Sequence, residues 1–399
     1  MNTGGVAAAH GPTLSYAAPL FAHLPRADQR RWAHAYLTGL VTAPGKKTVR
    51  SLAAAVTDSP TASQSLHQFI NTSPWEWAPT RRVLADWVEP RMDARAWTVD
   101  VALLRKRGPH SCGVHRRFVS STGRSAVCQL GVGMFLTGPE CAVPVDWQLL
   151  LPGPWDLDRD RRHRVRVPDE VHVPTIEHTV MSMIDNLAHL AGPRLPVVAD
   201  LSGCNDAERV VRTLSRRGLD FMVAVPDGFR VMLGRRPGRG ATARPGVEVS
   251  ARSLFHLGAE GVPAQQPPTD GTPQAVTVSQ VGVPGLVAER AAAPHVLLAV
   301  PGRRHQRLWL TSLADRSIEV HTTLLNTPRV SRLAVRRLAA EFGMADFEGR
   351  SYPGWHHHMT MVSAAYAYCV LGAAAPRPLP WSHAEAHLRG AGVQPGALP

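Results

Sequence analysis

Two aspartates, Asp100 and Asp200, each follow a short apolar run, and their carboxylates are groups that could do chemistry. Trp97-Thr-Val precedes the first acid and Val197-Val-Ala precedes the second, and both runs are typical of β-strands. Carboxylate oxygens are hard ligands that favour Mg²⁺ or Mn²⁺, the ions that assist phosphoryl transfer. A plainer interpretation is that Asp200 only caps the helix that follows it.

Basic residues gather at two places in the sequence. Lys46, Lys47 and Arg50 stand at the expected start of a helix, where free backbone amides also attract phosphate. In the last third of the chain, four arginines recur at nearly helical spacing: Arg329, Arg332, Arg336 and Arg337. Each set could bind DNA, and each could instead be an ordinary solvated face of a helix.

The chain as a whole is strongly basic. It has 44 Lys and Arg against 31 Asp and Glu, a net charge of +13, and nearly all of the cations are Arg. Because guanidinium groups hold phosphates in a bidentate fork, a polyanion such as double-stranded DNA is the natural partner. A codon bias would explain the choice of Arg over Lys but not the net excess.

Length and cysteine usage set further bounds. At 399 residues and 44% hydrophobic content, the chain can bury a sizeable core in two or three domains. Its five cysteines lack paired C-x-x-C spacing, which argues against a disulfide framework and a zinc ribbon.

No signal peptide opens the sequence, and the apolar stretch 359–375 is typical of a buried core helix. We therefore expect a cytoplasmic protein without a membrane partner.

Hydrophobic periodicity divides the chain into segments. We expect a helical domain over 15–92, a mixed α/β sheet that starts in 93–227, a β-rich segment over 228–318, closing helices over 319–375, and loose ends at 1–14 and 376–399. Strands are predicted at 97–104, 117–120, 126–136, 142–151, 195–200, 247–249, 275–281 and 295–300, with a helix at about 174–191. This pattern favours an α/β fold.

The last third of the chain has the clearest helix signal. Thr327 is a suitable N-cap and Pro328 suits the first helical position. Its expected buried face comprises Val330, Leu333, Ala334, Leu338 and Phe342.

Several blocks of sequence carry a family resemblance. The stretch 341–358 reads EFGMADFEGRSYPGWHHH, and it is preceded by SLHQFINTSPW, by 100–129, by PVDWQLLLPGPWDLDRDRR over 144–162, and by 196–226. In order and content these blocks resemble the 701-type insertion-sequence transposases. The three histidines that close the signature spread across about 200° of a helix and cannot all bind one metal ion, so we interpret them as structural or DNA-contacting.

This resemblance implies a ribonuclease-H-like core, in which helices cover a mixed sheet, with a helical N-terminal DNA-binding domain and a β-rich insertion. It also implies a DDE enzyme that cleaves and joins DNA strands in transposition, with three acids that hold Mg²⁺ or Mn²⁺. Double-stranded DNA is the implied partner. The sequence leaves the oligomeric state open, with a homodimer as one alternative.

Two of the three acidic positions look altered. The family reads Asp-Asp-Thr-Gly-Phe at the first acid, whereas this chain reads Asp100-Val-Ala-Leu-Leu, so the second Asp falls on Val101. Neighbouring residues on a strand point to opposite faces, and Asp100 is not an automatic substitute. The third acid of the family lies nine residues before the position of Glu341, and 341 − 9 = 332 is Arg332 here.

Two hypotheses follow. In the first, the chain is a transposase that uses Asp100 and Asp200 as its catalytic and metal-binding acids, although its competence is in question. In the second, it is a catalytically inactive, domesticated transposase that binds DNA or a protein partner as a regulator. We expect Asp100 and Asp200 to end adjacent strands, and Arg332 to pair with Asp200 in place of a metal ion.

Overall fold

The structure is a computed structural model. It describes residues 15–119, 123–187, 195–204, 206–233, 247–256, 262–265, 275–284, 295–301 and 306–372. The loose ends expected at 1–14 and 376–399 lie outside this part of the chain. Within it, no helix is long and apolar enough to cross a membrane.

The chain before residue 92 is helical where it is described. Its elements are α2 (Ala27–Thr42), α3 (Val49–Val56), α4 (Ala62–Asn71), α5 (Trp77–Val88) and the short 3₁₀ helix η1 (Glu89–Arg91). Helix α3 begins where the Thr48 hydroxyl accepts a hydrogen bond of 3.1 Å from the backbone N–H of Ser51. Helices α2, α3 and α4 pack on one another, whereas α5 packs against the sheet.

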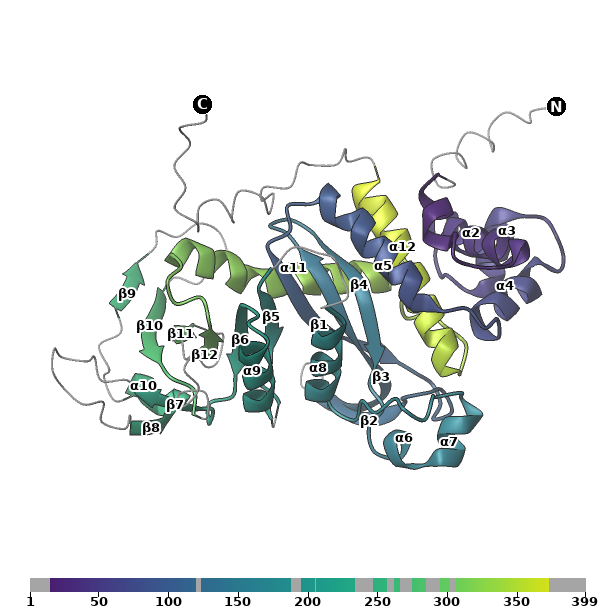
Figure 1. The fold of residues 1–399 in the computed structure, drawn as a ribbon. Coiled ribbons are helices and arrows are strands. Elements are labelled where there is room, and N and C mark those ends of the chain that lie inside the picture. The colour runs from purple at the N-terminus through teal and green to yellow at the C-terminus, as the bar shows by residue number, and fades with distance from the viewer. Residues whose placement is uncertain are drawn as a thin grey trace, which may run out of the picture.

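The five strands expected between 97 and 200 form, and a further strand, β6, forms at 221–225, where none was predicted. They are β1 (Ala96–Arg105), β2 (His115–Val119), β3 (Arg124–Thr137), β4 (Ala142–Leu149), β5 (Val197–Asp200) and β6 (Phe221–Val225). Strands β3 and β4 run antiparallel in the order β4-β3-β1, while β5 is parallel to β1 and β6 is parallel to β5. Helix α8 (Ile176–Leu187) precedes β5 and α9 (Ala207–Arg216) precedes β6. The order β4-β3-β1-β5-β6 with these crossovers is the ribonuclease-H-like arrangement, so the expected α/β fold is confirmed (Figure 1).

The β-rich segment extends this sheet. Its elements are β7 (Arg230–Leu233), β8 (Val247–Ser250), α10 (Ala251–His256), β9 (Val262–Gln265), β10 (Ala275–Val281), β11 (His295–Val300) and β12 (Arg307–Thr311). Strand β12 pairs with β6, and β11, β10 and β9 follow it outward, while β7 and β8 form a separate pair. The insertion and the core therefore share one continuous sheet, and the expected domain boundaries stay a prediction.

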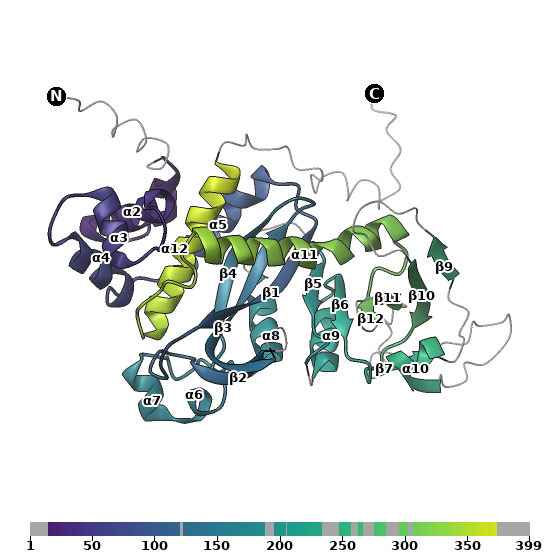
Figure 2. The ribbon, with the colours of Figure 1, turned by 180° about the vertical axis from the view of Figure 1, so that it is seen from behind.

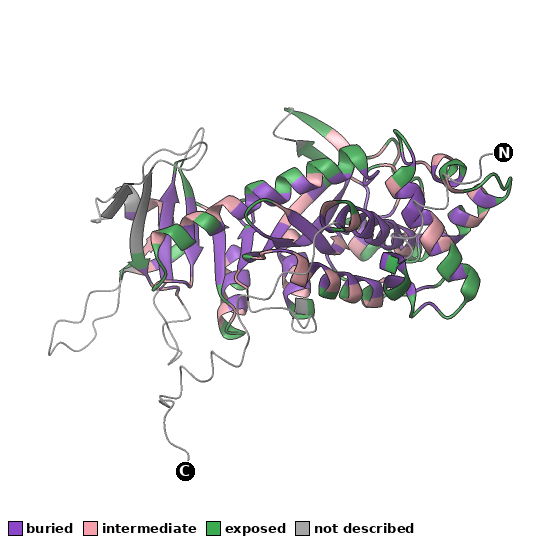
Figure 3. Cartoon of the chain, turned by 90° about the horizontal axis from the view of Figure 1, so that it is seen from above, coloured by how far each residue is buried: buried purple, intermediate pink, exposed green. Residues whose placement is uncertain are grey.

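Helices cover the two faces of the sheet. The remaining helices are α6 (Pro154–Leu157), α7 (Arg159–Arg164), α11 (Ile318–Glu341) and α12 (Tyr352–Leu371). Helices α8 and α9 lie in front of the sheet in Figure 1, whereas α11 and α12 cross its other face in Figure 2. The strands between them are buried, and exposed residues lie along the outer sides of the helices (Figure 3). A core cluster that includes Val198, Trp309 and Leu324 fills the space between the sheet and the first half of α11.

Helix α11 departs from its expected start. It begins at Ile318, and Pro328 lies inside it. A proline has no N–H for the carbonyl of Leu324, but the Thr327 hydroxyl donates to that carbonyl at 2.8 Å, so the helix continues. The expected buried face is correct except for Leu333, whose residue is 46% exposed on the outer side of the helix.

Helix α12 is buried along nearly all of its length. The imidazole of His357 lies 2.9 Å from the carbonyl of Ile70 and 2.8 Å from that of Trp75, and stacks on the Trp75 ring. The ring of His358 lies 2.9 Å from the Tyr36 hydroxyl and 3.0 Å from the Gly343 carbonyl. The histidines of the signature therefore attach the N-terminal helices to the core, and their burial leaves none of them on a DNA-facing surface.

A buried arginine joins three further elements. The guanidinium of Arg81 on α5 donates to Asp146 at 2.6 Å, to the Trp147 carbonyl at 2.7 Å and to Thr360 on α12 at 2.8 Å. It also donates to Nδ1 of His356 at 3.1 Å, because an arginine has no acceptor. Burial, helped by the nearby Arg81 charge, places the pKa of His356 well below its ordinary value.

We expect Arg81→Met to destabilise the fold by about 3–5 kcal/mol, because it leaves Asp146 without its cation in a largely buried setting. Urea unfolding followed by circular dichroism measures the change. The neighbouring Arg82 is exposed, so Arg82→Met is a matched control that should stay within about 0.5 kcal/mol of the wild type. Equal losses in the two variants would contradict the role given to the buried network.

The stability should also depend on pH through His358. Burial lowers the pKa of His358 from 6.5 to about 4, so the unfolded chain takes up the proton first as the pH falls. The contribution of His358 is complete above pH 6.5 and is lost as the pH drops toward 4. Between pH 7.5 and 5 this loss is about 2 kcal/mol. Urea unfolding at both pH values should show a smaller loss in His358→Gln, whereas exposed His67→Gln should keep the wild-type loss.

Candidate functional site

The two acids lie on neighbouring strands and on one face of the sheet. Strands β1 and β5 pair in parallel, with Thr98 opposite Val198 and Val99 opposite Ala199. Val198 points into the core under α11, so Asp200, two residues on, shares that face. Asp100 shares it as well, because it is two residues on from Thr98. Val101 lies on the opposite face, so Asp100 is the residue beside Asp200. Asp200 ends its strand as expected, whereas Asp100 lies within β1.

Helix α11 contacts Asp100 through Ser331 rather than through Arg332. The Ser331 hydroxyl donates to Oδ2 of Asp100 at 2.8 Å, and the backbone N–H of Val101 donates to Oδ1 at 2.8 Å. Burial raises the pKa of Asp100, and the negative charge of Asp200 acts in the same direction. The Ser331 bond, the Val101 N–H and the Arg332 charge oppose this rise. The two acids are thus close enough to influence each other's ionisation.

The cation that pairs with Asp200 is Arg307. Its Nη1 lies 3.1 Å from Oδ2 of Asp200, while the Ser202 hydroxyl donates to Oδ1 at 2.6 Å. Arg307 reaches the acid because β12 lies beside β6 and β6 beside β5. Arg332 is exposed, and its Nε donates to the Pro328 carbonyl at 2.8 Å. The expected pairing partner was therefore wrong: the inserted strand β12 supplies the guanidinium, and no local motif around Arg307 signals this role.

The donor set does not fit a pair of divalent ions in this arrangement. Each carboxylate oxygen of Asp100 and Asp200 already accepts from a hydroxyl, a backbone N–H or the guanidinium of Arg307. In the described part of the chain, no three His, Cys, Asp or Glu side chains gather closely enough to hold a metal ion. A guanidinium beside Asp200 also repels cations.

The expected DNA-binding residues do not all lie on the surface. Lys46 and Arg50 are exposed at the start of α3, but Lys47 is buried. Its ammonium donates to the Ala43 carbonyl at the end of α2, and its backbone N–H donates to Asp346 at 2.8 Å. Burial lowers the pKa of Lys47. Lys47 is therefore an internal contact that holds the start of α3 against the loop after α11.

The arginines of α11 are exposed but separate into two directions. Arg329, Arg332 and Arg336 are three to four residues apart and share one side of the helix. Arg337 points elsewhere, because its guanidinium pairs with Glu341 at 3.3 Å and lies over the Tyr366 ring. We define the first three residues as the α11 stripe. Arg337 is already engaged by an acid and is left out of it.

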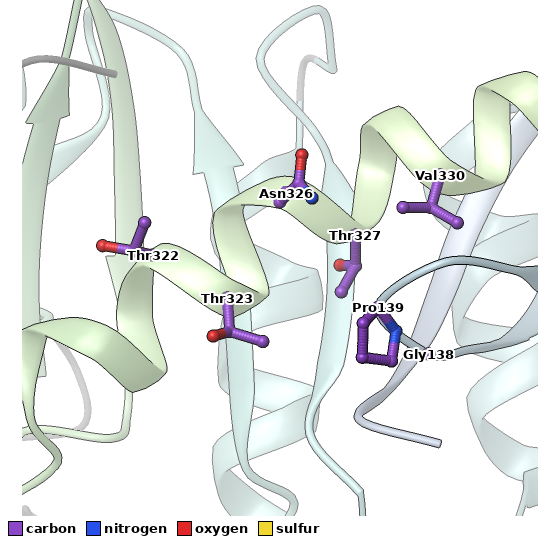
Figure 4. Close-up of a pocket in the computed structure, with 7 residues that line it drawn as sticks. All are labelled: Gly138, Pro139, Thr322, Thr323, Asn326, Thr327 and Val330. Atoms are coloured by element: carbon purple, nitrogen blue, oxygen red, sulfur yellow. The ribbon is translucent and has the colours of Figure 1, made fainter. Parts of the chain in front are cut away.

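A shallow pocket of about 220 Å³ lies beside another side of α11 (Figure 4). It is lined by Gly138, Pro139, Thr322, Thr323, Asn326, Thr327 and Val330. None of these residues is charged or titratable, so the pocket offers no acid, base or strong metal ligand. It is separate from the acid pair and explains no chemistry.

One comparison with known proteins identifies a family. A family profile described as a DDE superfamily endonuclease matches residues 19–260, which is more than half of the chain. The structure resembles that of piggyBac transposase in a synaptic complex with hairpin DNA, determined by cryo-electron microscopy. The sequence identity is 11% and the TM-score is 0.38, over 91% of this chain and 71% of that chain. A comparison with curated proteins found no match.

We expect Arg307→Gln to make Mn²⁺ binding about three- to tenfold tighter, because removal of the guanidinium frees one oxygen of Asp200 and removes a repulsive charge. Isothermal titration with Mn²⁺ measures the change. The gain should disappear in an Arg307→Gln, Asp200→Asn double variant. Arg316→Gln removes an exposed arginine elsewhere and should bind Mn²⁺ as the wild type does. Identical titrations for wild type and Arg307→Gln would show that Arg307 does not block the acid.

Proposed function

Because this chain belongs to the DDE superfamily endonucleases, we propose that it is a DNA-binding protein of the 701-type insertion-sequence transposase group. It binds double-stranded DNA but does not cut it, because of the way in which Asp100 and Asp200 are engaged. A catalytically inactive, domesticated transposase would act in this way. The ion pair between Asp200 and Arg307 is the observation that carries this proposal.

Support for DNA binding comes from exposed cations on two parts of the fold that a hydrogen bond connects. Lys46 and Arg50 stand at the start of α3, which the Lys47–Asp346 hydrogen bond ties to the loop after α11. The exposed α11 stripe lies on the helix that covers the acid pair. Arginine and lysine side chains at these positions can neutralise phosphates, and the net charge of +13 favours a polyanion.

Support for the loss of cleavage comes from the acids themselves. Two-metal phosphoryl transfer needs carboxylates that bridge and flank two ions. Here the position of the third acid holds Arg332, and the α11 side chain that reaches Asp100 is the Ser331 hydroxyl. A serine and two arginines around two aspartates favour a charge-balanced site over a metal-binding site.

One observation favours a second candidate function, strand cleavage and transfer in DNA transposition. Asp100 and Asp200 keep neighbouring places on one face of the sheet, as metal-holding acids would. The pair between Asp200 and Arg307 is partly exposed, with side chains 33% and 45% accessible, and such pairs contribute only about 0–1 kcal/mol. DNA phosphates could draw Arg307 away, after which Oδ2 of Asp200 would be free to accept Mg²⁺ or Mn²⁺ without an opposing guanidinium.

The two functions are separated by a cleavage assay on duplexes that carry the ends of the protein's own genomic locus. We expect the wild type to bind these duplexes and to leave them uncut with Mg²⁺ or Mn²⁺. Magnesium-dependent cleavage that disappears in Asp200→Ala would establish the second candidate instead.

Salt dependence tests the binding itself. We expect the Lys46→Ala, Arg50→Ala variant to bind all duplex sequences more weakly and to reduce the slope of log K against log salt by up to about 1.8, if each cation contacts a phosphate. Fluorescence anisotropy at several salt concentrations measures this slope. Arg26 and Arg95 are each paired with an aspartate, so Arg26→Ala, Arg95→Ala removes the same charge as a control and should leave the slope unchanged. Wild-type binding that ignores salt would refute the proposal.

A further inference from the structure

One long stretch of the chain contains cations and no acids. Between Asp100 and Glu140 the sequence has no Asp or Glu. It holds six basic residues, which are Arg105, Lys106, Arg107, Arg116, Arg117 and Arg124. A surface that has only one sign of charge repels itself unless a counter-charge covers it. An anionic partner is the natural source of that counter-charge.

The fold turns this stretch into a β-ribbon. Strand β2 pairs antiparallel with the start of β3, from His115 opposite Cys128 to Val119 opposite Arg124. The end of β1 pairs with β3 at the same point, since Arg105 is also opposite Cys128. We define the β2–β3 ribbon as 115–118 and 124–128. Arg116, Arg117 and Arg124 are exposed on it.

The ribbon also exposes an aromatic ring. Phe118 is 62% exposed, opposite Ser125 in the pairing. Among the large hydrophobic residues exposed in the described part of the chain, it is the only aromatic one. The hydrophobic effect disfavours the exposure of such a ring to water, so an exposed ring often marks a surface that a partner covers. Arg116 shares the face of Phe118, whereas Arg117 and Arg124 lie on the other face of the ribbon. An aromatic ring beside an arginine is typical of a surface that contacts bases as well as phosphates.

The ribbon belongs to the same sheet as the acid pair and shares one face with Asp100. On β3, Ser125 shares a face with Gly133, which is opposite Asp100, so Phe118 and Arg116 lie on the Asp100 face of the sheet. Burial raises the pKa of the Cys204 thiol, and the charges of both Asp200 and Arg117 act on it. Arg117 therefore lies near the loop that follows Asp200. Ser125 and Gly133 are eight residues apart on β3, about 26 Å along an extended strand, so a duplex that contacts the ribbon and continues along the sheet would reach the acids.

We propose that the β2–β3 ribbon binds in a groove of double-stranded DNA, with its arginines on phosphates and Phe118 against a base step. A major groove about 12 Å wide admits a two-stranded ribbon, and apolar wedges next to arginines are used to contact base steps in the minor groove. The inference rests on the proposed DNA-binding function and adds a surface to it. It needs neither metal binding nor cleavage.

The test compares how tightly the wild type and the ribbon variants bind a 30-base-pair duplex. Fluorescence anisotropy at several salt concentrations measures the binding. Arg116→Ala, Arg117→Ala should reduce the salt slope by up to about 1.8, because two phosphate contacts are lost. Phe118→Ala should weaken binding by about three- to tenfold with the slope unchanged, because an apolar contact releases no counterions. Phe118→Trp keeps an aromatic ring and should bind within about twofold of the wild type.

Matched controls come from the same chain. Leu157 is 80% exposed, so Leu157→Ala removes an exposed apolar side chain away from the ribbon. Arg230 and Arg252 are each paired with an acid, so Arg230→Ala, Arg252→Ala removes two arginines whose charge is already balanced. Both controls should bind as the wild type does. Thermal unfolding by circular dichroism confirms that every variant is folded.

The outcomes separate this inference from the proposed function. If the wild type shows no salt-dependent DNA binding, the proposed function fails. If the wild type binds but the ribbon variants keep its affinity and slope, only the ribbon assignment is overturned. If the ribbon variants lose affinity only for single-stranded DNA, the groove contact is overturned. If they lose affinity for the duplex and the control variants do not, the groove contact is established.

Discussion

The parallel pairing of β1 with β5 is the constraint on which the rest of the site depends. The register that sets Val99 opposite Ala199 places Asp100 and Asp200 side by side, and strand alternation turns both toward α11. A shift of one residue in either strand would send one acid to the face under α8 and α9. The buried apolar residues before each acid prevent that shift, because Val198 must stay in the core under α11.

Two like charges held this close need compensation. At Asp100, burial and the nearby Asp200 raise the pKa, while the Ser331 hydroxyl, the Val101 N–H and the Arg332 charge stabilise the carboxylate. Further compensation comes from Arg307, which the inserted strands bring to Asp200 through their pairing with β6. The insertion is therefore coupled to the acid pair through a contact that is partly exposed and weak. A ligand with a higher density of negative charge than one carboxylate could compete for that guanidinium.

Much of the fold could be predicted because its signals are local. Short apolar runs located the core strands, and the apolar stretch 359–375 marked most of the buried helix α12. Pro328 misled the prediction of the start of α11, because a threonine hydroxyl satisfies the carbonyl that the proline leaves free. Leu333 follows the helical period but extends beyond the sheet, where no partner buries it.

The candidate site was predicted only in part, for a similar reason. Asp100 and Asp200 follow recognisable strands, so their neighbouring places could be anticipated from the sequence. Arg307 lies more than a hundred residues from Asp200 in the chain, and only the strand order brings them together. Lys47 looked like a surface cation because its neighbours are polar, but the fold uses its ammonium and its backbone N–H as internal contacts.

The attachment of the N-terminal helices determines where their cations can act. His358 holds α2 against the core, and His357 holds the end of α4 and the segment that follows it. The Lys47–Asp346 bond holds the start of α3. These contacts are buried or partly buried hydrogen bonds, and an imidazole that lost its partners here would be left unsatisfied in the core. The cost of that loss disfavours a free swing of the N-terminal helices. In the proposed DNA complex, Lys46 and Arg50 would therefore meet the backbone from a fixed position relative to α11, and the fold would set the path of the duplex.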